Sequence, residues 1–376
     1  GQHRGRNFAA AAAAVGELSQ SDIHFLKPPM SQTGFAKLAQ ITEFDEVIDV
    51  RSPAEYAEDH LPNAINCPVL DDEQRARIGT LYKQESPFAA KKIGAVLVAR
   101  NIATHIERLF LDKPRDWHPL IYCWRGGQRS GAFTHILRQT GWDARRLEGG
   151  YKTWRKHVAS QLTTLPQEFS WRVISGATGS GKSHLIEALA AQGAQVLHLE
   201  KLAAHKGSVL GDLPDAAQPS QKMFESRLFS AMQTFDVTRP IFVEAESRRI
   251  GSVQLTDAML TMIRTSPCLR IEASTAARVE FLLRDYAYFL ADPRWLIERL
   301  DQLRGLQSNQ MIDRWTQLIH AGEFPTLVAE LLEQHYDPLY RRSQSRAQND
   351  KTSIHVSDDL SAEGIGRIAA EIIKYS

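Results

Sequence analysis

The amino-acid sequence predicts an α/β protein of two domains, each built on a largely parallel sheet. Strand-like apolar runs alternate with helix-like runs in both halves of the 376-residue chain. In each half, one of the strand-like runs enters a glycine-rich loop that opens a helix. The segment 161–168, polar and containing proline, separates the two series as an interdomain linker does.

The first series of elements occupies residues 30–160. Strands are expected where short apolar runs end at turn residues, and helices where a proline or polar residue opens a run with helical spacing. The charged segment 70–116 predicts a helical insert in this domain, with 91–110 as its clearest helix. The expected strands are 46–50, 64–66, 120–122 and 145–147, and the expected helices are 53–58, 128–140 and 151–160.

The second series occupies residues 169–376. The block 275–347 is helical throughout, and because a strand follows it we interpret it as an insertion on the sheet. Within this block, the expected helix 278–290 has one apolar face, formed by Val279, Leu282, Leu283, Tyr286 and Leu290. This face favours packing against the sheet, and the alternative is that it covers a site for an apolar ligand. The expected strands are 171–175, 196–200, 241–244, 269–272 and 353–356, and the expected flanking helices are 183–191 and 362–374.

Composition narrows the class of protein. The net charge of +1 gives no argument for nucleic-acid binding, which would need a local basic patch. No apolar run approaches the roughly 20 residues needed to span a bilayer. Three widely spaced cysteines predict neither a disulfide framework nor a zinc ribbon, so we expect reduced thiols and a cytoplasmic location. We also expect a monomer. Residues 1–20, rich in alanine and lacking a signal peptide, are interpreted as an added leader or a disordered segment.

The first glycine-rich loop carries a thiol. Cys123 ends a strand, Gly126 and Gly127 allow a tight turn, and Arg125 and Arg129 bring positive charge. A helix N-terminus and guanidinium groups stabilise a thiolate or a bound anion, so the loop predicts a reactive cysteine rather than a buried strand-end cysteine. Cys67 could resolve a persulfide but favours packing, and Cys268 is expected to be structural.

The second loop satisfies the phosphate-binding P-loop pattern in its strand–loop–helix context. Gly176, Gly179 and Gly181 shape a cradle of backbone N–H groups for a diphosphate, Lys182 neutralises a terminal phosphate, and Ser183 can hold Mg²⁺. The pattern does not identify the phosphate compound.

Three carboxylates are candidates to act with this loop as an acid or base or through Mg²⁺. Glu244 ends a buried strand, and alternation would place Glu246 on the same side if the strand continued. Glu200 is expected at the end of another strand. A simple ion pair of Glu246 with Arg248 or Arg249 remains open.

Two basic segments are candidate RNA contacts because guanidinium groups and aromatic rings suit RNA phosphates and bases, although such runs are often solvated surface. They comprise Arg248 and Arg249 in one segment and Tyr340, Arg341, Arg342 and Arg346 in the other.

Residues 40–160 resemble the rhodanese family. The resemblance rests on the loop 123–130 and on the segments 47–56, 60–66 and 147–154, all in the family's order. It implies that Cys123 carries a transferable sulfur or selenium atom and that Asp49 and Arg51 belong to the scaffold.

From about residue 30 to its end, the chain resembles the bacterial tRNA 2-selenouridine synthase family. The segments 67–75, 79–82, 218–225, 242–251 and 335–340 carry this resemblance, and the chain departs from the family pattern at 199–208. The resemblance implies S-geranylation of a wobble 2-thiouridine from geranyl diphosphate, followed by replacement of the geranylthio group with selenium from selenophosphate. The P-loop would then hold a prenyl diphosphate, and the Cys123 loop would serve the selenium step.

Two other functions fit the generic motifs. A rhodanese-type sulfurtransferase coupled to an NTP-dependent kinase or adenylating domain needs nothing beyond the two loops. A rhodanese fold serving only as a binding module on a P-loop scaffold is disfavoured by the intact Cys123 and Arg129.

Overall fold

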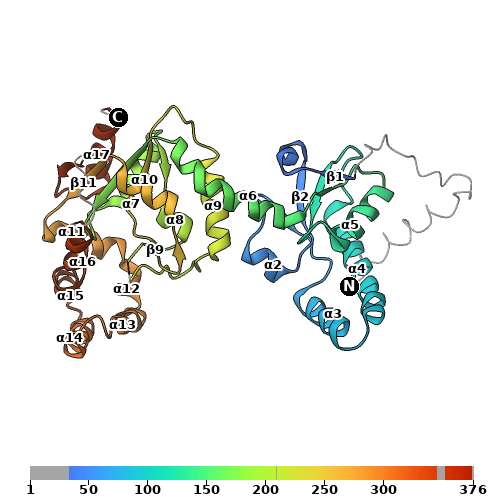
Figure 1. Ribbon diagram of the computed structural model, residues 1–376. Coiled ribbons are helices and arrows are strands. Elements are labelled where there is room, and N and C mark those ends of the chain that lie inside the picture. Colours follow the sequence, from blue (N-terminus) through green and yellow to red (C-terminus); the bar gives the residue numbers. More distant parts are fainter. Residues whose placement is uncertain (1–33, 209, 345–351, 375–376) are drawn as a thin grey trace, which may run out of the picture. The chain divides into compact units, whose positions relative to one another are not determined.

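The computed structural model describes residues 34–208, 210–344 and 352–374 (Figure 1). Contacts divide the chain into two compact units, the first ending at Trp154 and the second beginning at Arg155. Among the described residues, each unit holds a five-stranded parallel sheet, which confirms the α/β class. The division falls inside helix α6 (Gly150–Thr164), so the segment 161–168 forms the end of α6 and the 3-10 helix η3 (Leu165–Glu168).

The sheet of the first unit has the strand order β1-β5-β4-β2-β3. Its strands are β1 (Phe35–Ala36), β2 (Glu46–Asp49), β3 (Ile65–Asn66), β4 (Pro119–Tyr122) and β5 (Arg145–Leu147). Its helical elements are η1 (Leu38–Glu43), α2 (Pro53–Glu58), α3 (Asp72–Gln84), α4 (Pro87–His105), η2 (Ile106–Phe110) and α5 (Gln128–Gln139), followed by α6.

The predicted elements of the first unit are present, with ends shifted by a few residues. The predicted helical insert comprises α3 and α4, which begin at the N-cap residues Asp71 and Ser86 and continue into η2. Strand β1 was not expected, since two residues are too short to show an alternating pattern. The buried core beside the sheet contains both Cys67 and Cys123.

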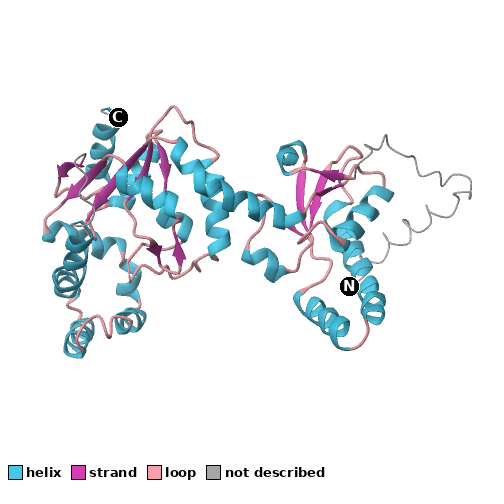
Figure 2. Cartoon of the chain, viewed as in Figure 1, coloured by secondary structure: helices cyan, strands magenta, loops and turns pink. Residues whose placement is uncertain are grey.

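The second unit has the strand order β12-β11-β6-β8-β7. Figure 2 draws its strands in magenta and its helices in cyan. Its parallel strands are β6 (Trp171–Gly176), β7 (Gln195–Leu197), β8 (Ile241–Glu244), β11 (Cys268–Glu272) and β12 (Thr352–Val356), with a separate hairpin of β9 (Arg249–Ile250) and β10 (Val253–Gln254). The helices beside them are α7 (Lys182–Ala191), α8 (Leu199–Ala203), α9 (Gln221–Met232), α10 (Asp257–Thr265) and α17 (Ala362–Lys374).

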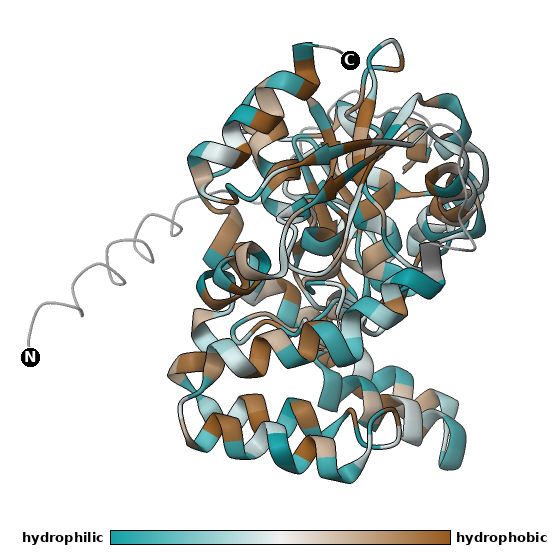
Figure 3. Cartoon of the chain, turned by 90° about the vertical axis from the view of Figure 1, so that its left-hand side faces the viewer, coloured by the Kyte–Doolittle hydropathy of each residue, from teal (hydrophilic) through white to brown (hydrophobic). Residues whose placement is uncertain are grey.

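The predicted helical insertion is present as a chain of short helices with its own apolar core. In Figure 3, apolar positions alternate with polar ones along these helices. They are α11 (Thr275–Asp285), α12 (Ala287–Ala291), α13 (Pro293–Asp301), α14 (Asn309–His320), α15 (Phe324–Leu331), η4 (Leu332–Tyr336) and α16 (Asp337–Gln344). The described part of the chain contains no helix that combines the length and the apolar composition of a transmembrane span.

Two predicted elements of the second unit are wrong in detail. The strand expected at 196–200 ends at Leu197, and Glu200 lies in the first turn of α8. The continuous helix expected at 278–290 breaks at Tyr286 between α11 and α12. The break lets Tyr286 line the cavities described below rather than continue a single apolar stripe.

Candidate functional site

The Cys123 loop connects β4 to α5 in the first unit, as predicted. The Cys123 side chain is 3% exposed, and its Sγ lies 3.2 Å from the Oγ of Ser130 on the first turn of α5. Gly127 is the N-cap residue of that helix. The thiol therefore lies beside a helix N-terminus, where backbone N–H groups and the helix dipole favour an anion.

Glycines are required where this loop meets the segment after β5. Gly126 has a φ of +67°, and a Cβ placed there would lie 2.9 Å from the carbonyl oxygen of Leu147. A Cβ on Gly150 would lie 2.3 Å from the carbonyl oxygen of Cys123. The Cys123 loop and the segment after β5 therefore contact each other through backbone atoms, at positions where any side chain would clash. This close contact fixes the shape of the loop.

The two arginines of the loop differ in position. Arg129 directs its guanidinium to Glu55 of α2, with Nη1 donating to Oε2 at 2.6 Å, and this pairing was not foreseen. Burial alone would raise the pKa of Glu55, but the hydrogen bond and charge of Arg129 lower it. Arg125 is exposed at the loop. Arg129 thus holds the loop to α2 through its ion pair with Glu55. Arg125 is the exposed cation of the loop and is accessible to an incoming anion.

The remaining candidate residues of this unit lie in its interior. Asp49 and Arg51 form a buried ion pair at 2.5 Å, and the Arg51 guanidinium also packs over the ring of Tyr151 at 4.0 Å. Burial raises the pKa of Cys67 to about 12, so this thiol stays protonated in the core.

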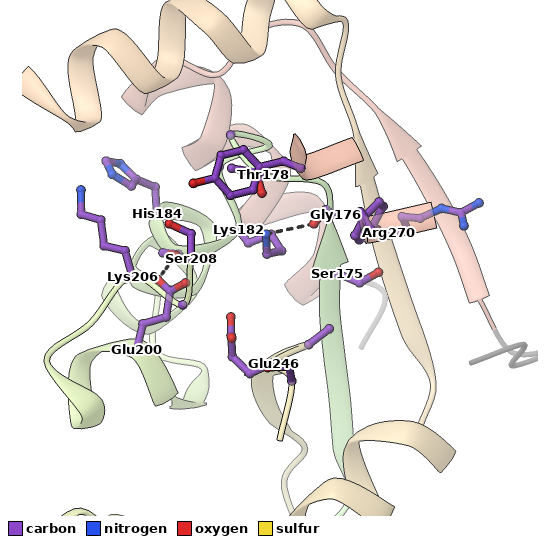
Figure 4. Close-up of a pocket in the computed structure, with 18 of the residues that line it drawn as sticks. Ser175, Gly176, Thr178, Lys182, His184, Glu200, Lys206, Ser208, Glu246 and Arg270 are labelled. Carbon is purple, nitrogen blue, oxygen red and sulfur yellow. Dashed lines mark hydrogen bonds between the residues drawn. The ribbon is translucent and has the colours of Figure 1, made fainter. Parts of the chain in front are cut away.

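The P-loop connects β6 to α7 in the second unit. Gly179 and Gly181 have φ values of +80° and +77°, a backbone conformation that favours glycine. A Cβ on Gly176 would lie 2.3 Å from the Oγ of Ser180, so this position also excludes a side chain. The Lys182 ammonium donates to the carbonyl oxygen of Gly176 at 2.9 Å, folding over the loop that would cradle a phosphate (Figure 4).

Two of the three predicted carboxylates lie beside this loop. Ser183 Oγ donates to Glu200 Oε2 at 2.5 Å, and Figure 4 shows Glu246 pointing from the loop after β8 toward the same space. A Cβ on Gly207 would lie 2.9 Å from Glu246 Oε2 and 3.1 Å from Glu200 Oε1, so both carboxyl groups adjoin this glycine. The structure therefore brings together Lys182, Ser183, Glu200 and Glu246.

Glu244 faces a different environment from Glu246, contrary to the expected alternation, because the strand ends at Glu244. It is 0% exposed, and its Oε2 accepts the backbone N–H of Leu199 at 2.9 Å. Its other oxygen pairs with the imidazole of His198. Glu244 therefore anchors the start of α8, the helix that carries Glu200.

We expect the second unit to lose stability with rising pH because of Glu246. Burial and the charge of Glu200 raise the pKa of Glu246 to about 8, while Lys182 opposes the shift and Glu244 adds to it. A raised folded-state pKa gives stability that is complete below pH 4.5 and is lost as pH rises through about 8.

The measurement is thermal unfolding of the full chain against pH in chelator-containing buffer, with the second unit's transition identified by its shift on adding diphosphate. Glu246→Gln should flatten this pH dependence across that range. Equal slopes in the two proteins would contradict the assignment.

A cavity of about 1560 Å³ opens over the P-loop. Its lining includes Lys182, Glu200 and Glu246, and it extends to Tyr336 and Arg270. An apolar cavity adjoins it inside the helical insertion and shares five lining residues with it. The shared residues are Thr178, Ser208, Leu282, Tyr286 and Tyr336.

The predicted basic segments divide between this cavity and the surface. Arg248, Tyr340 and Arg341 line the cavity, and Arg248 pairs with Asp257 at 2.6 Å rather than with Glu246. Arg249 is exposed and donates to the carbonyl oxygen of Gly251, and Arg342 is exposed on α16. Arg346 lies outside the described residues.

Several charged residues of the cavity were not found from the sequence. Lys206 donates to Asp285 at 2.8 Å and lies over the ring of Tyr286, and His184 of α7 contacts the same aspartate. Arg270 enters the cavity from β11. The alternation of Cys268 and Arg270 with the apolar Leu269 and Ile271 was the available signal for it.

Comparisons with known proteins match both halves of the chain. Residues 33–157 match the family model of the rhodanese-like domain. Residues 169–308 match the model described as the tRNA 2-selenouridine synthase AAA domain.

Three similar proteins, each named tRNA 2-selenouridine synthase, come from different bacteria. The one from Nitrosomonas europaea is 36% identical, over 68% of this chain and 66% of its own length. The one from Aeromonas salmonicida is 30% identical, over 78% and 86%. The one from Marinobacter nauticus is 31% identical, over 81% and 89%. The matched region thus covers just under two thirds of the first relative and more than four fifths of the other two.

Proposed function

The chain belongs to the tRNA 2-selenouridine synthase family, and we propose that it converts 2-thiouridine in tRNA into 2-selenouridine in two steps. In the first step the sulfur atom is alkylated with a geranyl group from geranyl diphosphate. In the second, selenium from selenophosphate replaces the geranylthio group. The P-loop unit would serve the first step and the Cys123 loop the second.

The observation that carries the first step is the apolar cavity beside the P-loop. Leucine, valine and phenylalanine side chains supply most of its lining, including Phe289, Phe324 and Leu327. Such a lining favours a hydrocarbon chain, whereas an adenine base needs polar partners for its ring nitrogens. The volume of this cavity is about 60 Å³, less than a geranyl chain occupies, so a prenyl chain that extends from a diphosphate at the P-loop would enter it as the surrounding helices move apart.

The P-loop residues would bind the diphosphate and stabilise it as the leaving group. Lys182 would turn from its contact with Gly176 toward the phosphate oxygens, joined by backbone N–H groups at the start of α7. The hydroxyl of Ser183 and the carboxylate of Glu200 suit Mg²⁺, which is commonly held by one or two protein oxygens together with phosphate oxygens. When bound, the ion would neutralise charge on the departing diphosphate.

Alkylation at sulfur also releases a proton. The new bond joins sulfur to geranyl carbon 1, the bond from that carbon to the diphosphate oxygen breaks, and the uridine loses its N3 proton. Glu200 and Glu246 adjoin one another in the cavity and are the candidate acceptors of this proton.

The second step would take place at the Cys123 loop. A carbon–selenium bond forms at carbon 2, the carbon–sulfur bond breaks, and geranyl thiol leaves, while the phosphate of selenophosphate passes to water. The helix N-terminus beside Cys123 and the exposed guanidinium of Arg125 would hold selenophosphate as an anion while its selenium attacks carbon 2 and its selenium–phosphorus bond breaks.

A substitution in the apolar cavity tests the prenyl assignment. Val328→Phe adds bulk to a cavity-lining position, so we expect the KM for geranyl diphosphate to rise about tenfold, a cost of about 1.4 kcal/mol. The affinity for inorganic diphosphate, measured by calorimetry, should stay unchanged, and dimethylallyl diphosphate should be affected less because its chain is shorter. An unchanged KM for geranyl diphosphate would contradict the placement.

Labelled ATP distinguishes this function from the sulfurtransferase alternative. Under the proposal, ATP is not turned over in the presence of the tRNA substrate, and geranyl diphosphate is consumed. ATP turnover without prenyl transfer would favour a sulfurtransferase coupled to an NTP-dependent domain.

A further inference from the structure

One face of the second sheet is open along its β11–β12 edge. On the opposite face, Ile174 of β6 and Ile271 of β11 pack into the core that includes residues of α7 and α17. On the open face, residues at paired positions of β6, β11 and β12 all line the P-loop cavity. The pairs are Val173 with Cys268 and Thr352, and Ser175 with Arg270 and Ile354. We call this surface the sheet-face groove.

The walls of the sheet-face groove carry arginines. Arg264 of α10 and Arg341 of α16 are exposed and line the same cavity as Arg270. Arg248 joins them from the loop after β8. The cavity's acidic lining residues, by contrast, are the ones already placed near the P-loop and α8, together with Glu187 and Asp285. The groove is therefore the cationic end of the cavity.

The ion pairs of these arginines are made with solvent-exposed acids. Arg270 pairs with Glu272, whose side chain is 48% exposed, and Arg248 pairs with Asp257, which is 84% exposed. Exposed pairs of this kind contribute at most about 1 kcal/mol. A phosphate group can therefore take the place of the carboxylate at small cost.

The floor of the groove is suited to bases rather than to a peptide of opposite charge. Ile354 on the edge strand β12 is 52% exposed, the floor also contains the buried Val173 of β6, and Tyr340 of α16 adds an aromatic ring to the wall. Unstacked bases pack on apolar and aromatic side chains while arginines contact the phosphates, which is how proteins bind single-stranded RNA. A duplex presents its phosphates but keeps its bases stacked inside.

We propose that the sheet-face groove binds the single-stranded loop of the RNA substrate and delivers its modified uridine to the P-loop. This inference rests on the proposed function for the identity of the RNA. It moves the centre of the predicted RNA site from the basic segment that begins at Tyr340 to a groove with a floor of β6, β11 and β12 and with arginines from α10, β11, α16 and the loop after β8. Continuity of the groove with the P-loop cavity gives the base a path to the prenyl donor.

Binding of an anticodon stem-loop RNA to the full chain, without geranyl diphosphate, tests the groove separately from the chemistry. Arg264→Ala, Arg270→Ala and Arg341→Ala should each weaken binding about five- to tenfold and lower the salt slope by about one unit per lost phosphate contact. Arg367→Ala removes the same charge from α17, where the side chain is 61% exposed, and should change neither quantity. Unchanged binding in all three groove variants would overturn the proposal, as would equal competition by a fully paired RNA duplex.

The thiol of Cys268 provides a second readout that requires no substitution. It is partly exposed in the groove, where its Sγ donates to Ser175 Oγ at 3.0 Å, whereas Cys67 and Cys123 are buried. Saturating stem-loop RNA should slow maleimide labelling of Cys268 at least fivefold, and an unpaired RNA of unrelated sequence should protect it less. Labelling at the same rate in the RNA complex would place the RNA elsewhere. Protection of Cys268 by the RNA, in a protein that shows no geranylation activity, would support the groove as the RNA site and count against the proposed function.

Discussion

Replacing Cys123 by alanine is expected to abolish selenium incorporation while geranylation continues. The only described thiol beside a helix N-terminus and an exposed arginine is Cys123, and the other loop atoms offer no substitute for it. Cys123 is the reactive group proposed to act beside the selenium donor, and removing a group of this kind lowers rates by about 1000-fold or more, because neighbouring residues cannot replace it. Nucleoside mass spectrometry after single-turnover reactions would measure 2-selenouridine and S-geranyl-2-thiouridine in the same sample.

Two further variants make this result interpretable. Cys67→Ala should retain selenium incorporation, because the pKa of about 12 keeps the Cys67 thiol protonated. If Cys67 resolved an intermediate, this variant would lose selenium incorporation. Ser130→Ala removes the hydroxyl 3.2 Å from Cys123 Sγ and should reduce only the selenium step. If folded Cys123→Ala protein lost both products, the assignment of one step to each unit would be refuted.

Replacing Lys182 by alanine is expected to reduce geranylation by roughly two to three orders of magnitude, the range for removing one preorganised group that stabilises developing charge. The diphosphate gains negative charge as it leaves, and Lys182 is the P-loop cation positioned over the loop. Geranyl diphosphate titrations would separate weaker binding from a slower chemical step.

Lys201→Ala is the matched control, since Lys201 also lines the cavity but is exposed on α8. Geranylation by this variant should stay within about threefold of the unmodified protein, as expected for an exposed charge. Selenium transfer to an RNA supplied with the S-geranyl group already attached should survive Lys182→Ala. Unchanged geranylation kinetics in Lys182→Ala would eliminate the P-loop as the diphosphate site.

Local patterns predicted most of the fold and the two loops. Both loops combine a buried strand, glycines that need positive φ, and a helix start, and each of these features is encoded within about ten residues. Helices α2 and α17 were placed with their observed ends for the same reason. The family resemblance, which begins at about residue 30, then implied a chemistry that the generic motifs leave open.

What the sequence did not predict depends on residues far apart in the chain. Arg129 pairs with Glu55, which is 74 positions away in the chain. Glu244 accepts the backbone N–H of Leu199, where α8 begins, so the chain turns into a helix two residues after β7. Arg270 joins the cavity only because β11 and β12 pair beside β6. Such contacts are set by strand order and packing, which single-sequence periodicity does not contain.

The most direct test of the two-step account is a reconstitution with the purified full chain. A stem-loop RNA carrying 2-thiouridine is incubated first with geranyl diphosphate and Mg²⁺, and then with selenophosphate, and its nucleosides are identified by mass spectrometry. The account predicts S-geranyl-2-thiouridine after the first addition and 2-selenouridine with free geranyl thiol after the second. Formation of 2-selenouridine without geranyl diphosphate, or a requirement for ATP in its place, would contradict it.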